Sequence, residues 1–396
     1  MKKSPNRGTP AIAALAVCAL PLAVCAFEKI ALVDSFDFVS LLDAETKAGT
    51  EKIVDHVMLT GADTLLWRNQ SGSTPRYPSA EEMRPIKEPP IDKRRVPLSG
   101  IYGWSQLDKG ETNLIAHAFS YMASRGRRTG IHLTFEENHW ATFTFGGWNL
   151  DHPQYWCRTH KGAPLCKRSS FAYDEVLAHK MRLFDELLDM DPDTIFVDMF
   201  RSGGWTPAQE YVPPVLAAWR SKYGSTPPPA DAKDERWLKI VSVYVERYMR
   251  ALRSHIDARG RRTRLLLGLP YVDLQDREVW ERYALDWKKL AADGVVDGIV
   301  VMSVRPSPKD PYGSTRAVYD HVMKCRGKAK VWFHCSVYNY EPGIPTYCKL
   351  TGDSQAEAAR KLLQMAKDAG GEGVVLECVD WGNYKPEVNK VLNEFK

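Results

Sequence analysis

The chain has 396 residues, of which 44% are hydrophobic and 26% are charged, and its formal net charge is +5. This composition fits one large globular domain or two average ones, and it excludes a disordered or low-complexity chain. Because residues 1–26 hold three basic residues and no acidic one, the remainder has a formal charge of only +2, which argues against nucleic acid as a partner.

Residues 1–26 have the pattern of a secretory signal peptide. Basic residues precede an apolar stretch over 11–22, and small residues occupy 23–26. A basic start, an apolar middle and a small-residue end define such a signal, so we expect cleavage after Ala26 and a secreted or periplasmic protein. The apolar stretch is too short, and too interrupted by Pro21, to predict a membrane span.

Six cysteines follow the signal peptide, an even number that permits disulfides in an exported chain. Cys157 and Cys166 lie in one predicted loop and are the best candidate pair. Cys25 offers an alternative end to the leader, a lipid anchor, although Val24 is a poor residue before a lipidated cysteine. No CxxC pair and no His–Cys spacing indicates zinc, so we expect neither a metal nor a cofactor.

Apolar runs and stretches of helical spacing alternate along the rest of the chain. The runs have the continuous Val/Ile/Leu character of strands buried on both faces. Strands are expected at 29–37, 64–69, 129–135, 194–200, 264–270, 298–303, 330–336 and 373–378. Helices are expected at 44–60, 113–124, 174–188, 214–223, 236–258, 278–292, 315–325, 356–369 and 386–395. Long loops at 71–110 and 136–170 interrupt the pattern.

These repeats predict an α/β fold, a (β/α)8 TIM barrel with long loops at the C-terminal face, as a single domain over 27–396. An open doubly wound sheet is the alternative. No GxGxxG follows the first strand and no GxxxxGK[ST] occurs, so no nucleotide site favours the open sheet.

The fourth predicted strand, within DTIFVDMFR, places Asp198 inside an apolar run and Arg201 after it. Burying an unpaired carboxylate costs several kcal/mol or shifts its pKa. Because TIM barrels carry their active sites at the C-terminal ends of the strands, Asp198 is a candidate catalytic carboxylate. The alternative is a structural ion pair with Arg201 or Arg305.

Glu377 and Glu137 are the candidates for a second catalytic acid. Glu377 shares a strand face with Val375 and should point into the barrel, whereas Glu136 and Glu137 are neighbours, so at most one of them points inward. Substrate-binding candidates are Arg201, Arg68, Asp34, Glu136, His139, Trp148, Tyr271, Arg305, His334 and Trp381. Several have a structural alternative: Asp34 as a cap or ion-pair partner, Arg68 as a partner of the acids, His334 as a core histidine, and Trp148 as packing for its own loop.

Two carboxylates with aromatic surroundings are typical of glycoside hydrolysis. One acid protonates the leaving oxygen, and the other attacks the anomeric carbon or activates water. The chain has 12 Trp and 17 Tyr, and several fall in the predicted loops of the C-terminal face, where aromatic rings can stack on sugars. We therefore expect a polysaccharide or oligosaccharide partner; the sequence leaves the oligomeric state open.

The segment SSFAYDEVLAHKMRLFDELLDMDPDTIFVDMFRSGG resembles the central segment of glycoside-hydrolase-like TIM-barrel proteins of the family-10-like group. HPQYW is similar to the HPEW of those proteins, and YALDWKKLAADGVVDGIVV to a later segment, so the resemblance covers roughly residues 130–305. It implies a secreted, polysaccharide-directed barrel and places Asp198 and Arg201 on the D-x-x-R positions of the group. The strand-four and strand-seven Glu pair of better-known retaining barrels is not carried over, because strand seven has no acid before Glu341.

Two other functions remain open. A non-catalytic carbohydrate-binding barrel would keep the aromatic loops and lack a facing acid pair. A hydrolase or lyase for an acidic sugar would use His334 or Tyr271 as its base.

Overall fold

The structure is a computed structural model. It describes residues 27–33, 46–71, 74–75, 77, 79–81, 113–135, 147–199, 205–260, 262–270, 272–302, 304–335, 347–376 and 385–395. The expected signal peptide lies outside these residues and stays a prediction. Among the described helices, none combines the length and apolar character that a membrane crossing needs.

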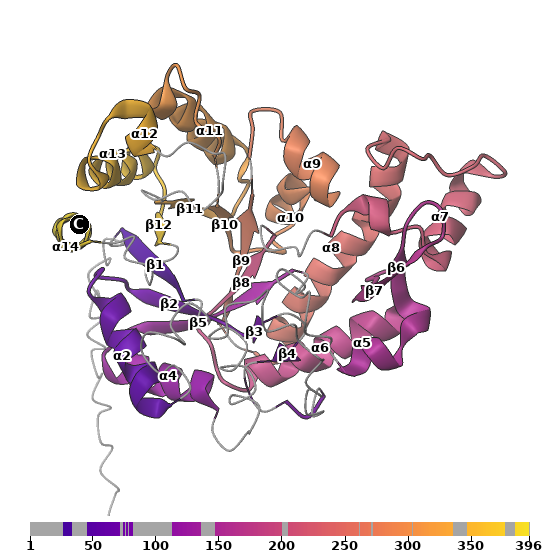
Figure 1. Ribbon diagram of the computed structural model, residues 1–396, viewed down its shortest axis with the longest axis horizontal. Helices are drawn as coiled ribbons and strands as arrows, with labels where there is room; N and C mark the ends of the chain where they lie inside the picture. Colours follow the sequence, from indigo (N-terminus) through magenta and orange to yellow (C-terminus); the bar gives the residue numbers. More distant parts are fainter. Residues whose placement is uncertain are drawn as a thin grey trace, which may run out of the picture.

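Eight parallel strands close into one barrel (Figure 1). They are β1 (Glu28–Val33), β2 (Thr64–Arg68), β5 (Arg128–Thr134), β8 (Thr194–Asp198), β9 (Arg264–Leu269), β10 (Gly298–Val301), β11 (Lys330–His334) and β12 (Gly373–Leu376). Neighbours pair in chain order, and β1 closes the ring by pairing with both β2 and β12. Each strand begins within one residue of its predicted start, and the TIM-barrel prediction is confirmed.

Helices surround this barrel and join its strands (Figure 1). They are α2 (Lys47–Met58), α4 (Leu114–Ser124), α6 (Asp174–Leu188), α7 (Pro213–Tyr223), α8 (Glu235–Ala258), α9 (Arg277–Tyr283), α10 (Trp287–Ala292), α11 (Pro311–Cys325), α12 (Tyr347–Thr351), α13 (Gln355–Asp368) and α14 (Pro386–Glu394). The longest is α8, which is capped at its N-terminus by Asp234. The Asp234 side chain accepts a hydrogen bond from the Arg236 amide, and the helix buries one apolar stripe against the barrel.

Two predictions of local structure were wrong. The helix expected over 278–292 is divided into α9 and α10, because Ala284 adopts a left-handed backbone (φ 46°) and Asp286 caps a new helix by accepting from the Lys289 amide. The segment expected as a loop over 136–170 contains α5 (Gly147–Asp151), a 3-10 turn η1 (Pro153–Tyr155) and an antiparallel hairpin of β6 (Trp156–Arg158) and β7 (Pro164–Ser169). The alternation of apolar and polar residues in this hairpin is too short to predict its strands from the sequence.

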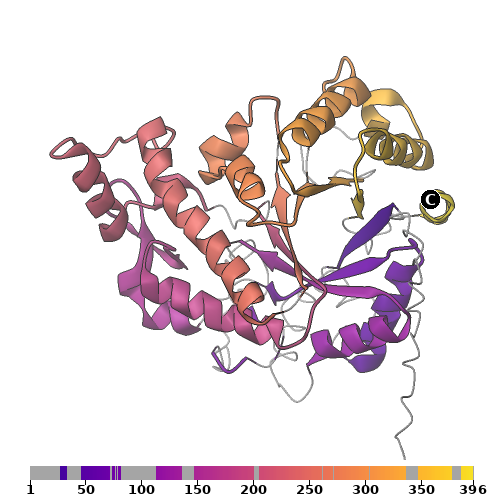
Figure 2. The same cartoon turned by 180° about the vertical axis from the view of Figure 1, so that it is seen from behind.

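The hairpin β6–β7, α5 and α7 lie together on one side of the molecule, beyond α6 and α8, in both views (Figure 1, Figure 2). Two shorter pieces complete the described structure: a small hairpin of β3 (Gln70–Ser71) and β4 (Thr74–Pro75), and the 3-10 turn η2 (Pro207–Gln209).

Side chains fill the centre of the barrel. The interior layer is apolar and consists of Ile30, Leu32, Leu66, Phe196, Leu266, Val300, Met302, Trp332 and Val375. Gly268 leaves room for the Phe196 ring, since a Cβ at this position would lie 2.7 Å from its Cζ. The barrel is therefore a packed core, and functional side chains can only lie at its ends.

The N-terminal end of the barrel is closed by Glu28, which is 6% exposed. Its carboxylate accepts hydrogen bonds from Arg264 at 2.9 and 3.0 Å and from the Thr64 hydroxyl at 2.6 Å, and it pairs with Arg128 at 2.8 Å. The Trp332 indole N–H donates to it at 3.2 Å. This end of the barrel is thus occupied by a satisfied structural network.

Candidate active site

Asp198 is the last residue of β8 and lies at the C-terminal end of the barrel. Side chains two residues apart on a strand share a face, so Asp198 points to the barrel interior, as Phe196 does. Its side chain is 0% exposed, and its Oδ2 lies 2.8 Å from Nε2 of His132 on the neighbouring strand β5. The buried carboxylate of Asp198 thus has a hydrogen-bonding partner in the imidazole on the neighbouring strand.

His132 was not among the predicted site residues. It lies in the middle of β5, is 0% exposed and contacts the Phe196 ring, with centroids 5.4 Å apart. In the sequence, His132 is a histidine within the apolar run TGIHLTF. A histidine that is simply buried in the core gives the same pattern, so the sequence did not single it out. Its partner became visible only with the strand order, because β5 and β8 are far apart in the sequence and adjacent in the barrel.

Arg68 is at the end of β2, on the other side of β5 from Asp198. It pairs in register with His132, is 3% exposed, and shares its strand face with Leu66 of the interior layer. Three consecutive strands of the barrel, β2, β5 and β8, thus bring Arg68, His132 and Asp198 to one part of its C-terminal end. A cation, an imidazole and a carboxylate together can bind hydroxyl groups and hold or transfer a proton.

His334 ends β11, three strands along the barrel from β8. It follows Trp332 of the interior layer by two residues, so it faces the interior at the same end of the barrel, and it is half-buried. This position suits a substrate contact, and it separates His334 from the Asp198–His132 pair.

Trp148, in α5, packs its loop onto α6. Its ring stacks on His152 on one side, with centroids 4.2 Å apart, and on His179 of α6, with centroids 4.3 Å apart. Both interplanar angles are below 20°. Neighbouring rings take these stacking positions, as the packing alternative for Trp148 predicts, and its role in substrate binding stays a prediction.

Arg305 is more than half exposed and pairs with Glu278 of α9 at 2.9 Å, so its charge is held at the outer edge of the C-terminal face. Its predicted roles, as a substrate contact or as the ion-pair partner of Asp198, stay predictions. The other predicted site residues lie outside the described part of the chain: Asp34, Glu136, Glu137, His139, Arg201, Tyr271, Glu377 and Trp381.

A second buried carboxylate, Glu210, supports the segment that follows β8. It is 2% exposed and accepts hydrogen bonds from the Ser170 hydroxyl and, at 2.7 Å, from the Trp205 indole N–H. The Trp205 ring packs edge-on against Phe135, with centroids 5.3 Å apart, and the Phe135 amide donates to the Asp198 carbonyl at 3.1 Å. Glu210 therefore connects the outer hairpin to the backbone that carries Asp198.

Cys157 takes part in the same cluster, with its Sγ 3.4 Å from Oε1 of Glu210. The side chain of Cys166 lies outside the described residues, so the Cys157–Cys166 disulfide stays a prediction. In the part of the chain that the structure describes, no group of three or more His, Cys, Asp or Glu side chains has the arrangement of a metal site.

Solved glycoside hydrolases share this fold. The PgaB (BpsB) glycoside hydrolase domain from Bordetella bronchiseptica aligns with a TM-score of 0.60 and 11% identity, over 94% of this chain and 99% of that one. A beta-galactosidase from the psychrophilic Marinomonas ef1 gives 0.56 and 13% identity over 89% and 54%, respectively. The catalytic domain of a beta-amylase from Paenibacillus polymyxa gives 0.53 and 11% over 93% and 98%.

Identities this low establish a shared TIM-barrel fold and leave the activity open. No protein-family model matches the chain, and no curated protein does. The resemblance to the family-10-like group therefore stays a prediction.

Proposed function

We propose that the protein is an exported glycoside hydrolase whose catalytic carboxylate is Asp198. The observation that carries this proposal is the buried Asp198–His132 pair at the C-terminal end of the barrel. The N-terminal end holds another buried acid, Glu28, but arginines neutralise it, as expected of a structural carboxylate. Asp198 is held at Oδ2 by an imidazole, a group that can give up or take a proton near neutral pH.

In the proposed mechanism, Asp198 acts as the nucleophile or the general base on the anomeric carbon or on a water molecule. His132 fixes the orientation of the Asp198 carboxylate through Oδ2. The charge of the carboxylate then stabilises the positive charge that develops on the sugar ring. Arg68, beside His132 on the next strand, orients sugar hydroxyls. The general acid is proposed to be Glu377 or Glu137, and retention or inversion depends on its separation from Asp198, about 5 Å or about 6.5–9.5 Å.

A polysaccharide or oligosaccharide is the proposed substrate, and secretion or periplasmic export through residues 1–26 is the proposed route to it. A non-catalytic carbohydrate-binding barrel is the second candidate. In that reading, Asp198 and His132 form a structural pair, since burial and pairing are also properties of structural carboxylates.

The test compares the protein without residues 1–26 with its near-isosteric Asp198→Asn variant on neutral, uronic and sulfated polysaccharides. Release of sugars by the first and a loss of about 10³-fold in the second, close to 4 kcal/mol of transition-state stabilisation, would establish Asp198 as catalytic. Equal activity would place the catalytic acids elsewhere. Binding without cleavage by either protein would favour the binding barrel.

A further inference from the structure

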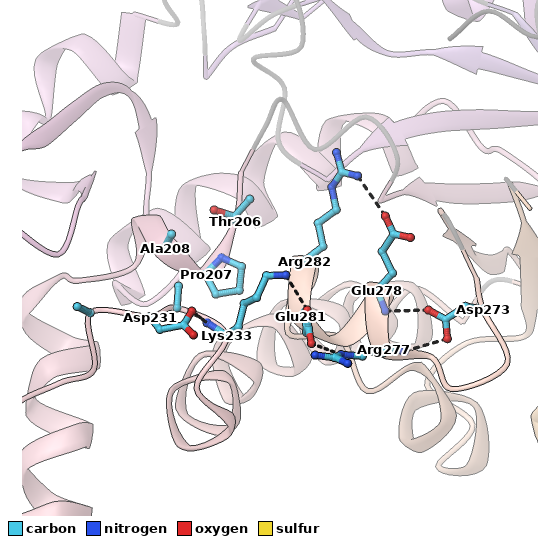
Figure 3. Close-up of a pocket in the computed structure, with 12 residues that line it drawn as sticks. Thr206, Pro207, Ala208, Asp231, Lys233, Asp273, Arg277, Glu278, Glu281 and Arg282 are labelled. Atoms are coloured by element: carbon cyan, nitrogen blue, oxygen red, sulfur yellow. Dashed lines mark hydrogen bonds and ion pairs between the residues drawn. The ribbon is translucent and has the colours of Figure 1, made fainter. Parts of the chain in front are cut away.

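A groove of about 660 Å³ lies at the C-terminal face of the barrel (Figure 3). It is formed by η2, by the connection between α7 and α8, and by the beginning of α9. These segments follow the C-terminal ends of β8 and β9, which are neighbouring parallel strands, so the groove and Asp198 belong to the same face. Its volume is within the range of about 300–1,000 Å³ that small-molecule sites occupy.

The two walls of the groove differ in chemistry. One wall carries Pro207 and Ala208, and α9 presents Glu278, Glu281 and Arg282 from the opposite wall (Figure 3). Thr206, Asp231 and Lys233 lie on the same side as Pro207 and Ala208, so that side joins a small apolar surface to polar groups, whereas α9 presents charged groups from the other side.

The charges on the polar wall are balanced. Glu281 pairs with Lys233 at 2.8 Å and with Arg277, and Glu278 pairs with Arg305 at 2.9 Å. The hydrogen bonds from Lys233 and Arg277 hold the pKa of Glu281 below its usual value, so its carboxylate remains a charged acceptor at neutral pH.

Asp273 is used locally, since its carboxylate accepts from the backbone amides of Gln275 and Glu278 at 2.7 and 3.0 Å. The described lining holds four acids and three bases, which leaves no excess of positive charge for a phosphate or sulfate group.

We infer that this groove binds a neutral stretch of the glycan chain, as an accessory subsite apart from the bond that is cleaved. A sugar ring has an apolar C–H face, which matches Pro207 and Ala208, and an edge of hydroxyl groups, which matches the carboxylates and guanidinium groups of α9. Each hydroxyl both donates and accepts, so a wall of mutually paired acids and bases satisfies it without a net charge. The inference rests on the proposed function.

The first test separates binding from cleavage by using Asp198→Asn as the background, beside the wild type. Electrophoresis in gels that contain soluble xylan, glucomannan or hydroxyethyl cellulose measures retardation by neutral glycans, and polygalacturonate serves as the charged comparison. Retardation by at least one neutral glycan is expected, and Glu281→Ala is expected to weaken it about tenfold, the size of one charge-assisted hydrogen bond.

Lys233→Ala is the second groove variant; its side chain is 65% exposed, so folding should not depend on it. Asp320→Ala is the matched control, because it removes an exposed pair with Arg316 on α11, outside the groove. Thermal melting confirms that all three variants are folded.

In the wild-type background, the groove variants should raise KM for a polysaccharide that is cleaved and leave kcat/KM for a 4-nitrophenyl monosaccharide unchanged. If the wild type cleaves the glycan and the groove variants show the same retardation and the same KM as the wild type, the subsite is overturned and the proposed function stands. If both groove variants weaken retardation but the wild type cleaves nothing, the groove is supported and the proposed activity is overturned. Retardation by no neutral glycan, or by polygalacturonate alone, overturns the subsite.

Discussion

Nε2 of His132 and Oδ2 of Asp198 lie 2.8 Å apart inside the barrel, and both side chains are almost completely withdrawn from solvent. A carboxylate in this setting keeps its position because the imidazole satisfies it, and the charge of the pair depends on the protonation of the imidazole. The orientation and the electrostatics of the proposed catalytic acid therefore both depend on a residue from the preceding strand of the barrel.

Replacing His132 with Asn should lower kcat about tenfold to 100-fold and change the pH dependence of kcat/KM, because Asp198 loses the imidazole that orients it. KM for a small glycoside should change little. The measurement is a pH–rate profile of the variant and the wild type. A lower melting temperature with an unaltered profile would assign His132 a structural role only.

Replacing Glu210 with Gln should lower the free energy of unfolding by about 1–3 kcal/mol, because one carboxylate oxygen becomes an amide nitrogen, which cannot accept the hydrogen bond from the Ser170 hydroxyl or the one from the Trp205 indole. Urea denaturation measures this loss. Glu394→Gln is the control, because Glu394 is 57% exposed on α14 and its replacement should have no measurable effect.

The same Glu210→Gln variant tests the connection to the active site. Trp205 packs on Phe135, whose amide binds the Asp198 carbonyl, so kcat should fall by more than the small loss of folded protein explains. An unchanged kcat in the folded variant would restrict Glu210 to stabilising the outer hairpin.

The Glu28 network should make the stability of the barrel depend on pH. Burial alone raises the pKa of Glu28, but hydrogen bonds and charges from Arg264, Thr64 and Arg128 outweigh it, and the net pKa is lowered from its usual 4.5. Because the folded-state pKa is lower than the unfolded one, this contribution is present above about pH 4.5 and is lost as the pH falls through the lowered value.

Glu28→Gln should therefore cost about 3 kcal/mol at pH 7 and flatten the decrease in stability below pH 4.5, as followed by urea denaturation at several pH values. Glycan cleavage by the folded variant should be preserved, since Glu28 is at the opposite end of the barrel from Asp198. An equally steep acid dependence in the variant would assign that dependence to other carboxylates.

Trp148→Ala should lower the free energy of unfolding by about 2 kcal/mol, because two ring-stacking contacts, to His152 and His179, are lost. Binding and cleavage of glycans should not change in the folded variant. A selective rise in KM with intact stability would return Trp148 to the substrate site.

Much of the architecture could be read in the sequence because each barrel strand is buried on both faces, which makes its residues a continuous apolar run. All eight starts were predicted within one residue, and α6 over Asp174–Leu188 matches its prediction at both ends. The division between α9 and α10 was missed because it depends on the left-handed backbone of Ala284, a residue type that gives no sign of such a turn.

The site was predictable in part for a different reason. A carboxylate within an apolar strand is conspicuous, so Asp198 was selected from the sequence. Trp148 was selected by residue type alone. Its partners are His152, four residues further along the chain, and His179 of α6, which only the packed structure brings against its ring.

By itself, the sequence determined that strands and helices alternate eight times and that Asp198 lies within one of these strands, near the C-terminal side of a barrel. Tertiary structure alone decided what surrounds that carboxylate. Strand order places His132 next to it and Arg68 one strand further along the barrel, and the packing of the outer hairpin buries Glu210. The physical reason is that strand periodicity is a local property of the chain, whereas the partners of a buried polar group come from segments that only barrel closure brings together.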